Sequence, residues 1–184
     1  MTRKIISLLF CTLIPIVYSF AQGSGSSGKS AVILAENAKP GTTDWMITKV
    51  VRDADEPYQK GWHRRTLIEG YASRTSVRSG ETLKFYVSTN PADKYKLDIF
   101  RMGYYAGKGG RLVKSMELQG KPQPTPAEGS NHIMECNWVE SGRLVIPKDW
   151  VSGVYLGLLS TMKTEGQAYI VFIVRDDRKS DILF

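Results

Sequence analysis

The chain has 184 residues, and its 25 lysines and arginines outnumber its 18 aspartates and glutamates to give a formal net charge of +7. Nucleic-acid-binding domains usually concentrate their cations on one element with a recognisable motif. Here the cations fall in many different segments, so we expect no nucleic acid as a partner. The length leaves room for one domain of ordinary size behind a leader.

Residues 1–21 have the pattern of a signal peptide. Arg3 and Lys4 supply a positive start, residues 5–17 are nearly all apolar, and Ser19-Phe20-Ala21 places small residues at the two positions that a signal peptidase reads. The apolar run is shorter than the roughly 20 residues that cross a bilayer. We therefore expect cleavage after Ala21, export to the periplasm or the extracellular space, and no membrane attachment afterwards.

The segment that follows, residues 22–30, is rich in glycine and serine, which is the composition of a flexible linker. We expect a single folded domain over residues 31–184. Residues 31–37 are predicted as its first strand, and Lys39-Pro40-Gly41 as the turn that ends this strand.

Much of the domain alternates apolar and polar residues with the two-residue period of strands. After an extended segment at residues 46–51 and a polar loop at residues 52–65, strand-like runs and turn residues follow each other about every ten residues. The inward-facing residues of two of these runs are Leu83, Phe85, Val87, Tyr95, Leu97 and Ile99. No helical period is found in the exported chain. We therefore predict an all-β fold, an immunoglobulin-like antiparallel β-sandwich.

Two long apolar runs, residues 149–160 and 168–177, flank a short polar stretch and predict an antiparallel hairpin at the centre of a sheet. Because these runs are so rich in apolar residues, we expect the sheet to be covered on both faces. The side chains expected in the core are Val154, Leu156, Leu158, Ile170, Phe172 and Val174.

Residues 103–110 contain four glycines beside Tyr104 and Tyr105. Such a loop can cradle an anion with its backbone N–H groups, but the residues after it are strand-like, whereas a phosphate loop normally leads into a helix. A glycine-rich hairpin is the favoured interpretation, because glycine supplies the positive φ angles of tight turns. Further on, three prolines between residues 120 and 130 predict a stiff extended connection, and residues 132–138 a short strand.

The sequence offers little for metal or thiol chemistry. Cleavage of the leader removes Cys11 and leaves Cys136 without a partner for an internal disulfide, and we expect this thiol to be a small buried side chain. The two histidines, His63 and His132, lack partners at the spacing of metal ligands. We therefore assign no catalytic and no metal-binding residue in this chain.

Five blocks of sequence carry a more specific signal. They are residues 36–45 (ENAKPGTTDW), 68–73 (IEGYAS), 100–107 (FRMGYYAG), 149–155 (DWVSGVY), and 174–177 (VRDD) with 180–184 (SDILF). In this order they resemble the amino-terminal β-sandwich of proteins related to the large (beta) subunit of N,N-dimethylformamidase. The resemblance runs from about Glu36 to Phe184.

The resemblance implies a partner. In that family, the segment similar to residues 180–184 leads into a larger carboxy-terminal domain with a glutamine-amidotransferase-like core. The amidase's mononuclear iron, held by tyrosines and a glutamate, belongs to that domain. The resemblance therefore implies no cofactor in this chain, and a catalytic domain as its partner, in cis or on a separate chain.

Three functions are compatible with these features. The favoured one is an accessory sandwich module of an exported relative of the amidase large subunit, without activity of its own. The alternative is a stand-alone exported module that binds a glycan or a protein, with Trp45, Trp62 and the tyrosine pair as stacking rings, although core or interface packing also accounts for these aromatics. A hydrolase is the least supported, because no catalytic constellation is recognisable.

The surface expected to contact the partner has two parts. Ile182, Leu183 and Phe184 form an apolar run that needs cover, and contiguous exposed apolar surface usually marks an interface. Tyr104 and Tyr105 suit a contact that is apolar in its body and polar at its tip. We expect both parts to lie on one docking face toward the catalytic domain.

Overall fold

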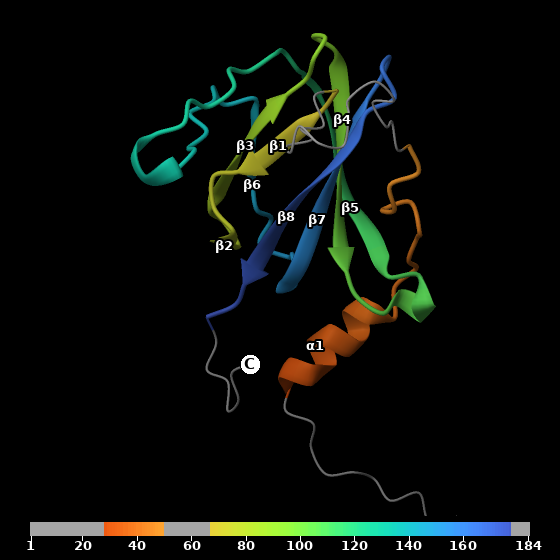
Figure 1. Cartoon of the computed structure of the whole chain (residues 1–184). Coiled ribbons are helices and arrows are strands. Elements are labelled where there is room, and N and C mark those ends of the chain that lie inside the picture. Colours follow the sequence, from red (N-terminus) through yellow and green to blue (C-terminus); the bar gives the residue numbers. More distant parts are fainter. Residues whose placement is uncertain (1–27, 50–66, 178–184) are drawn as a thin grey trace, which may run out of the picture.

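The computed structural model describes residues 28–49 and 67–177, and it shows two β-sheets and one α-helix there (Figure 1). The larger sheet consists, in spatial order, of β2 (Ser76–Arg78), β8 (Gln167–Arg175), β7 (Gly153–Thr161), β4 (Lys94–Met102) and β5 (Gly110–Gln119). The smaller sheet consists of β1 (Glu69–Ala72), β3 (Thr82–Ser88) and β6 (Gly142–Val145). The remaining elements are α1 (Gly28–Asn37) and two short 3-10 helices, η1 (Tyr105–Gly107) and η2 (Ser130–His132).

The core lies between the two sheets, so the predicted all-β sandwich is confirmed at this level. The expectation of antiparallel pairing is wrong at one edge of the larger sheet, where β2 pairs parallel with β8. Strand β3 contributes Leu83, Phe85 and Val87, and β4 contributes Tyr95, Leu97 and Ile99, all fully buried as the alternation predicts. Phe172 of β8 stacks on Tyr155 with ring centroids 5.6 Å apart and meets Phe85 edge-on at 6.3 Å. Aromatic contacts therefore join the two sheets directly.

The predicted central hairpin is confirmed, since β7 and β8 pair antiparallel inside the larger sheet. Ile170, Phe172 and Val174 are buried as expected. The expected core face of β7 is wrong: Val154 is 45% exposed, and Tyr155 and Leu159 join the core cluster instead. Leu156 is only half-buried, and Leu158 is buried but lies outside that cluster. Because both faces of β7 carry apolar residues, the sequence offered no way to choose the register.

The prediction that the sheet is covered on both faces is also only partly right. Near one end of β8, the Tyr169 hydroxyl donates to the Trp45 carbonyl at 2.8 Å and accepts from the Ile47 amide at 2.7 Å, so the chain before residue 50 crosses the sheet there. Toward the other end, Val171 and Ile173 are 56% and 45% exposed.

The strand predicted over residues 31–37 is wrong, because this segment belongs to helix α1, which begins at Gly28 within the predicted linker. Short apolar runs are ambiguous between helix and strand. The turn that ends the element is correctly placed: the Ala38 amide donates to the Leu34 carbonyl at 3.0 Å, and Pro40 and Gly41 follow. Residues 46–49, predicted as extended, belong to no strand.

Residues 132–138 do not form the predicted strand. They form the end of η2 and a single bridge between Glu128 and Met134, in a long connection that projects beside the smaller sheet (Figure 1). Cys136 is exposed, so the expectation that it is buried is wrong. In residues 132–138 only the side chain of Trp138 is buried. The Trp138 indole donates to the Pro124 carbonyl at 2.8 Å and so closes the connection at its base.

Several predictions concern residues outside the described ranges. These are the signal peptide, the linker up to residue 27, the loop at residues 52–65 with Trp62 and His63, and the segment Ile182, Leu183 and Phe184. Within the described ranges, no helix is long and apolar enough to span a bilayer.

Candidate interaction site

The glycine-rich segment is a hairpin, as favoured from the sequence: β4 and β5 pair antiparallel on either side of η1. Its turn residues Ala106 and Gly107 have φ angles of 54° and 81°. At Gly103 the reason for glycine is close approach, since a Cβ there would collide with the Asn37 side-chain oxygen and crowd the Tyr105 ring. Helix α1 therefore contacts the hairpin directly.

The tyrosine pair of this hairpin does not form one exposed surface. Tyr104 is 72% exposed, whereas Tyr105 is fully buried, so the expectation that both rings face a partner is wrong for Tyr105. Trp45 is half-buried and lies on the same hairpin: its indole donates to the Lys108 carbonyl at 3.0 Å, and a Cβ at Gly110 would stand 2.7 Å from its ring. Trp45 thus packs within the domain, which is the alternative interpretation of these aromatics.

A buried carboxylate connects α1 to the hairpin. Glu36 is only 2% exposed, and its Oε1 accepts from the Tyr105 hydroxyl at 2.9 Å and from Arg111 Nε at 2.7 Å. Its Oε2 accepts from Lys39 Nζ at 2.7 Å. Burial opposes ionisation, but the hydrogen bonds from Lys39, Arg111 and Tyr105 outweigh it and hold the pKa of Glu36 at about 2. Glu36 is therefore charged at neutral pH.

The network continues from Tyr105 to Arg101, which is 4% exposed. Arg101 Nη1 donates to the Tyr105 hydroxyl at 3.0 Å, and Nη2 donates to the Ser152 carbonyl at 3.0 Å. The Val151 carbonyl accepts from Arg101 Nε at 3.4 Å and from the Tyr155 hydroxyl at 2.6 Å. A chain of hydrogen bonds therefore runs from α1 through the hairpin to the loop between β6 and β7.

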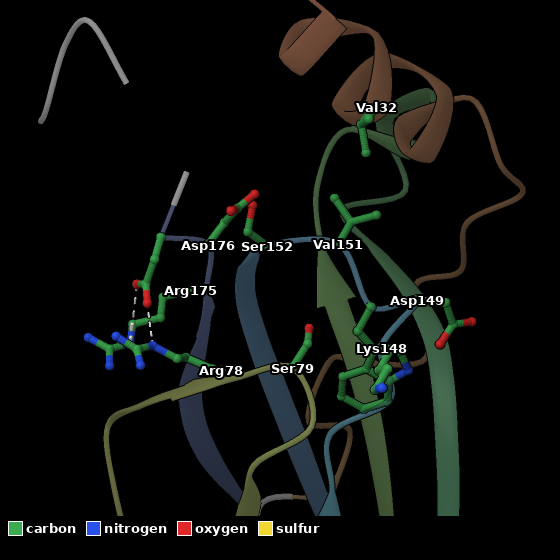
Figure 2. A pocket seen from close by; sticks show the side chains of 11 residues that line it. Val32, Arg78, Ser79, Lys148, Asp149, Val151, Ser152, Arg175 and Asp176 are labelled. Atoms are coloured by element: carbon green, nitrogen blue, oxygen red, sulfur yellow. Dashed lines mark ion pairs between the residues drawn. The ribbon is translucent and has the colours of Figure 1, made fainter. Parts of the chain in front are cut away.

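That loop forms one side of an open cleft of about 350 Å³ at the α1 end of the larger sheet. Figure 2 shows the residues that line it. Val32 reaches in from α1, residues 78–79 come from the end of β2, residues 148–152 from the β6–β7 loop, and residues 175–177 from the end of β8. Trp150, in the same loop, stacks on Tyr155 with centroids 4.7 Å apart and planes at 4°.

The two sides of the cleft differ in chemistry. On one side, Arg78 and Arg175 both pair with the carboxylate of Asp177, the second at 3.8 Å (Figure 2). On the other side stand Lys148 and Asp149, which have no ion-pair partner among the described residues. Val32 and Val151 point toward one another across the apolar part (Figure 2). The cleft therefore offers ion pairs and apolar contact together.

Comparison with known families places residues 96–184 in a family described as "N,N-dimethylformamidase beta subunit-like, C-terminal". This match supports the assignment of the chain to the N,N-dimethylformamidase beta subunit-like family. The description assigns the matched region to the C-terminal part of these proteins, so this match does not support the expected amino-terminal position within the family. The matched residues include most of the larger sheet and the whole β6–β7 loop.

The other comparisons add little to this family assignment. None of the curated proteins matches the chain. Among solved structures, it is similar to a β-glucosidase, EmGH1, from Erythrobacter marinus, at 12% identity and a TM-score of 0.28. The similarity covers 57% of this chain and 15% of that one. At this level it supports no conclusion about fold or function.

Three of the five family blocks recognised in the sequence meet at this end of the molecule. The first supplies Glu36, the third Arg101 and Tyr105, and the fourth Trp150 and the carbonyls that Arg101 binds. The blocks are visible in the sequence but the network is not, because Glu36 and its partner Tyr105 are 69 positions apart. The cleft residues Arg78 and Lys148 lie outside every block and were also missed.

The described residues do not assemble a metal site: they hold no group of three or more histidine, cysteine, aspartate or glutamate side chains suited to an ion. His132 pairs with Glu128 on the exposed connection, far along the chain from the cleft. The side chains of the cleft itself are suited to binding through charge and apolar contact.

Proposed function

We propose that this chain is an accessory, immunoglobulin-like β-sandwich module of an exported protein, and that it docks on a catalytic domain of the N,N-dimethylformamidase family. The observation that carries the proposal is the convergence of three family blocks on one end of the sandwich. There they build the Glu36 network behind an open cleft. The iron of that chemistry would belong to the partner, and we propose no cofactor for this chain.

The cost of this network supports a role beyond folding. A charge taken out of water is expensive, and replacing a buried ion pair by apolar side chains often leaves stability unchanged or improves it. Glu36, Arg101 and Tyr105 do connect three separate segments, and they do so directly behind the cleft. A cleft that is held in place before binding favours docking, because less conformational entropy is lost when the partner binds.

The alternative, a glycan-binding module, has less to rest on. A stacking platform needs exposed rings, and among the aromatics considered for it within the described residues only Tyr104 is largely exposed. Trp45 lies against the hairpin and Tyr105 is buried.

Co-purification tests the proposal. The exported chain and the separately produced catalytic region of a family large subunit are mixed and resolved by size-exclusion chromatography. We expect one complex, and we expect amide hydrolysis only in fractions that contain the catalytic region. Amide hydrolysis by the chain alone would contradict the accessory role, and two separate peaks at micromolar concentrations would contradict docking.

A further inference from the structure

The connection between β5 and β6, residues 120–141, projects beside the smaller sheet and is held firmly at its base (Figure 1). Gln123 Nε2 donates to the Val139 carbonyl at 2.8 Å, which joins the two ends of the connection. The Tyr71 hydroxyl of β1 donates to the Cys136 carbonyl at 3.1 Å. Ordered loops longer than about 12–15 residues are uncommon in compact domains, and they usually carry a function.

The tip of this connection, residues 127–137, is shaped by main-chain hydrogen bonds and not by packing. The Gly129 amide donates to the Ile133 carbonyl at 2.8 Å, and Glu128 and Met134 form an antiparallel bridge. Every residue of the tip is exposed, including Ile133 at 56% and Met134 at 57%. The domain thus keeps a defined turn outside its core and places two large apolar side chains there, where they gain nothing from burial.

The two apolar side chains lie on opposite sides of the tip. Ile133 has an extended main chain, with φ −82° and ψ 128°, and Met134 after it forms the bridge. Consecutive side chains of an extended segment point in opposite directions. A flat surface could therefore bury only one of the two, whereas a groove with two apolar walls would bury both.

The composition of the tip favours a protein as the owner of such a groove. Glu128, which pairs with His132, and Glu135 flank the apolar pair, and a bilayer that took up the tip would have to bury these carboxylates at high cost. A glycan would need a stacking ring, and the tip holds no tryptophan, tyrosine or phenylalanine. A second copy of the chain is a poorer fit, because its cleft is open and lined mainly by polar side chains.

We propose that the tip inserts as a wedge into a groove with two apolar walls on the partner catalytic domain, with Ile133 against one wall and Met134 against the other. This inference rests on the proposed docking function and names a contact for it. The tip lies within residues 96–184, the part of the chain that matches the family. Insertion loses little conformational entropy, because hydrogen bonds already shape the tip, and a methionine side chain adapts to an irregular wall.

Variants at the tip test the inference. The affinity of the chain from residue 22 onward for the separately produced catalytic region of a family large subunit is measured by isothermal titration calorimetry. The wild type is compared with Ile133→Asp, with Met134→Asp, and with a variant in which Gly-Gly replaces residues 128–134. The matched control is Val145→Asp, because Val145 is 59% exposed on β6, outside the connection. Circular dichroism and thermal unfolding check that each variant is folded.

We expect Ile133→Asp and Met134→Asp each to weaken binding at least about tenfold, because a carboxylate is costly to bury against an apolar wall. The Gly-Gly variant should bind at least as weakly and keep the melting temperature of the wild type, since the tip buries no side chain. Val145→Asp should leave the affinity unchanged.

Other results would overturn the inference. A loss of affinity in only one of the two aspartate variants would exclude a groove with two apolar walls. Wild-type affinity of the folded Gly-Gly variant would show that the partner binds elsewhere, while the proposed docking stands. A dimer of the wild type that the Gly-Gly variant loses, seen by light scattering after size-exclusion chromatography, would assign the tip to a second copy. Absence of binding by the wild type would overturn the docking function, and the inference with it.

Discussion

The two ends of β4 each bury a carboxylate, and they satisfy it in different ways. At the α1 end, Glu36 is bound by side chains: those of Lys39, Tyr105 and Arg111. At the other end, Asp93 is 3% exposed and its Oδ2 accepts mainly from main-chain amides, of Lys163 at 2.9 Å and Thr164 at 3.3 Å. The other oxygen of Asp93 has no hydrogen-bond partner among the described residues.

The two carboxylates therefore differ in reach: Asp93 holds one neighbouring loop, whereas Glu36 begins a network that extends to the loop between β6 and β7. Asp93 fixes the loop between β7 and β8 through the amides of Lys163 and Thr164. The hydrogen-bond network ends there, because each main-chain amide donates its one hydrogen to Asp93. Glu36 is followed by Tyr105 and then by Arg101, which binds the carbonyls behind the cleft. Only the α1 end therefore couples a buried charge to a surface that a partner can reach.

The largest effect is expected from removing the charge at the α1 end. Glu36→Gln leaves Arg111 beside an uncharged amide, and breaking a buried ion pair from one side costs roughly 3 kcal/mol or more. Urea unfolding of the chain from residue 22 onward at pH 7 measures the loss. Glu117→Gln, at an exposed position of β5, is the control and should change the free energy of unfolding by less than about 0.5 kcal/mol. Equal losses in the two variants would show that the network does not stabilise the fold.

Acid should erase part of this difference. The pKa of Glu36 is about 2 in the folded chain against an ordinary value of 4.5, so its contribution is complete above pH 4.5 and is lost as the pH falls toward 2. The stability difference between wild type and Glu36→Gln should therefore shrink by roughly half from pH 7 to pH 3. Urea unfolding of both proteins at the two pH values measures this. The other carboxylates cancel in the comparison, so a difference that stays constant would mean that Glu36 is not ionised in the network.

A smaller loss is expected from crowding the contact between α1 and the hairpin. Gly103→Ala places a methyl group against the Asn37 oxygen and near Arg101 Nη1, and such overpacking typically costs about 1–3 kcal/mol. Thermal unfolding followed by circular dichroism measures it. Lys108→Ala, in the same hairpin with an exposed side chain, is the control. If both variants have the melting temperature of the wild type, the contact between helix and hairpin is too loose to position the network.

The sequence predicted the strands on which only one face is apolar. In β3 and β4 the alternation placed Phe85 and Leu97 in the core correctly, because Lys84, Lys96 and Asp98 on the opposite face fix the register. In β7 both faces are apolar, and the predicted core face was wrong by one residue, which exposes Val154. For α1, a short apolar run allowed either helix or strand. In the structure the segment is a helix, and Glu36 and Asn37 near its end hydrogen-bond to the hairpin, a contact that the sequence did not reveal.

The candidate site was less accessible to prediction. Tyr104 and Tyr105 are neighbours in sequence, yet one is exposed and the other buried, because the left-handed φ of 40° at Tyr105 turns the chain inward at this point. The cleft is built from four separate segments of the chain, whose charged residues look like ordinary surface charges in the sequence. Three of the five family blocks were the sequence signal for this end of the molecule, although the blocks did not say which side chains meet.

The smallest effect of the series is expected at the far end of β4. Asp93→Asn keeps a carbonyl oxygen that can still accept from the Lys163 and Thr164 amides, so the loop between β7 and β8 loses charge but keeps its hydrogen bonds. Main-chain amides hold the pKa of Asp93 below its ordinary value of 3.8 even though burial opposes ionisation, so some stability is lost at pH 7. The fall in melting temperature should nevertheless be smaller than that of Glu36→Gln, because no cation is left unpaired. Asp44→Asn, at an exposed position, is the control. An equal or larger fall for Asp93→Asn would show that the two buried carboxylates contribute alike, and that coupling to the cleft adds nothing to the α1 end.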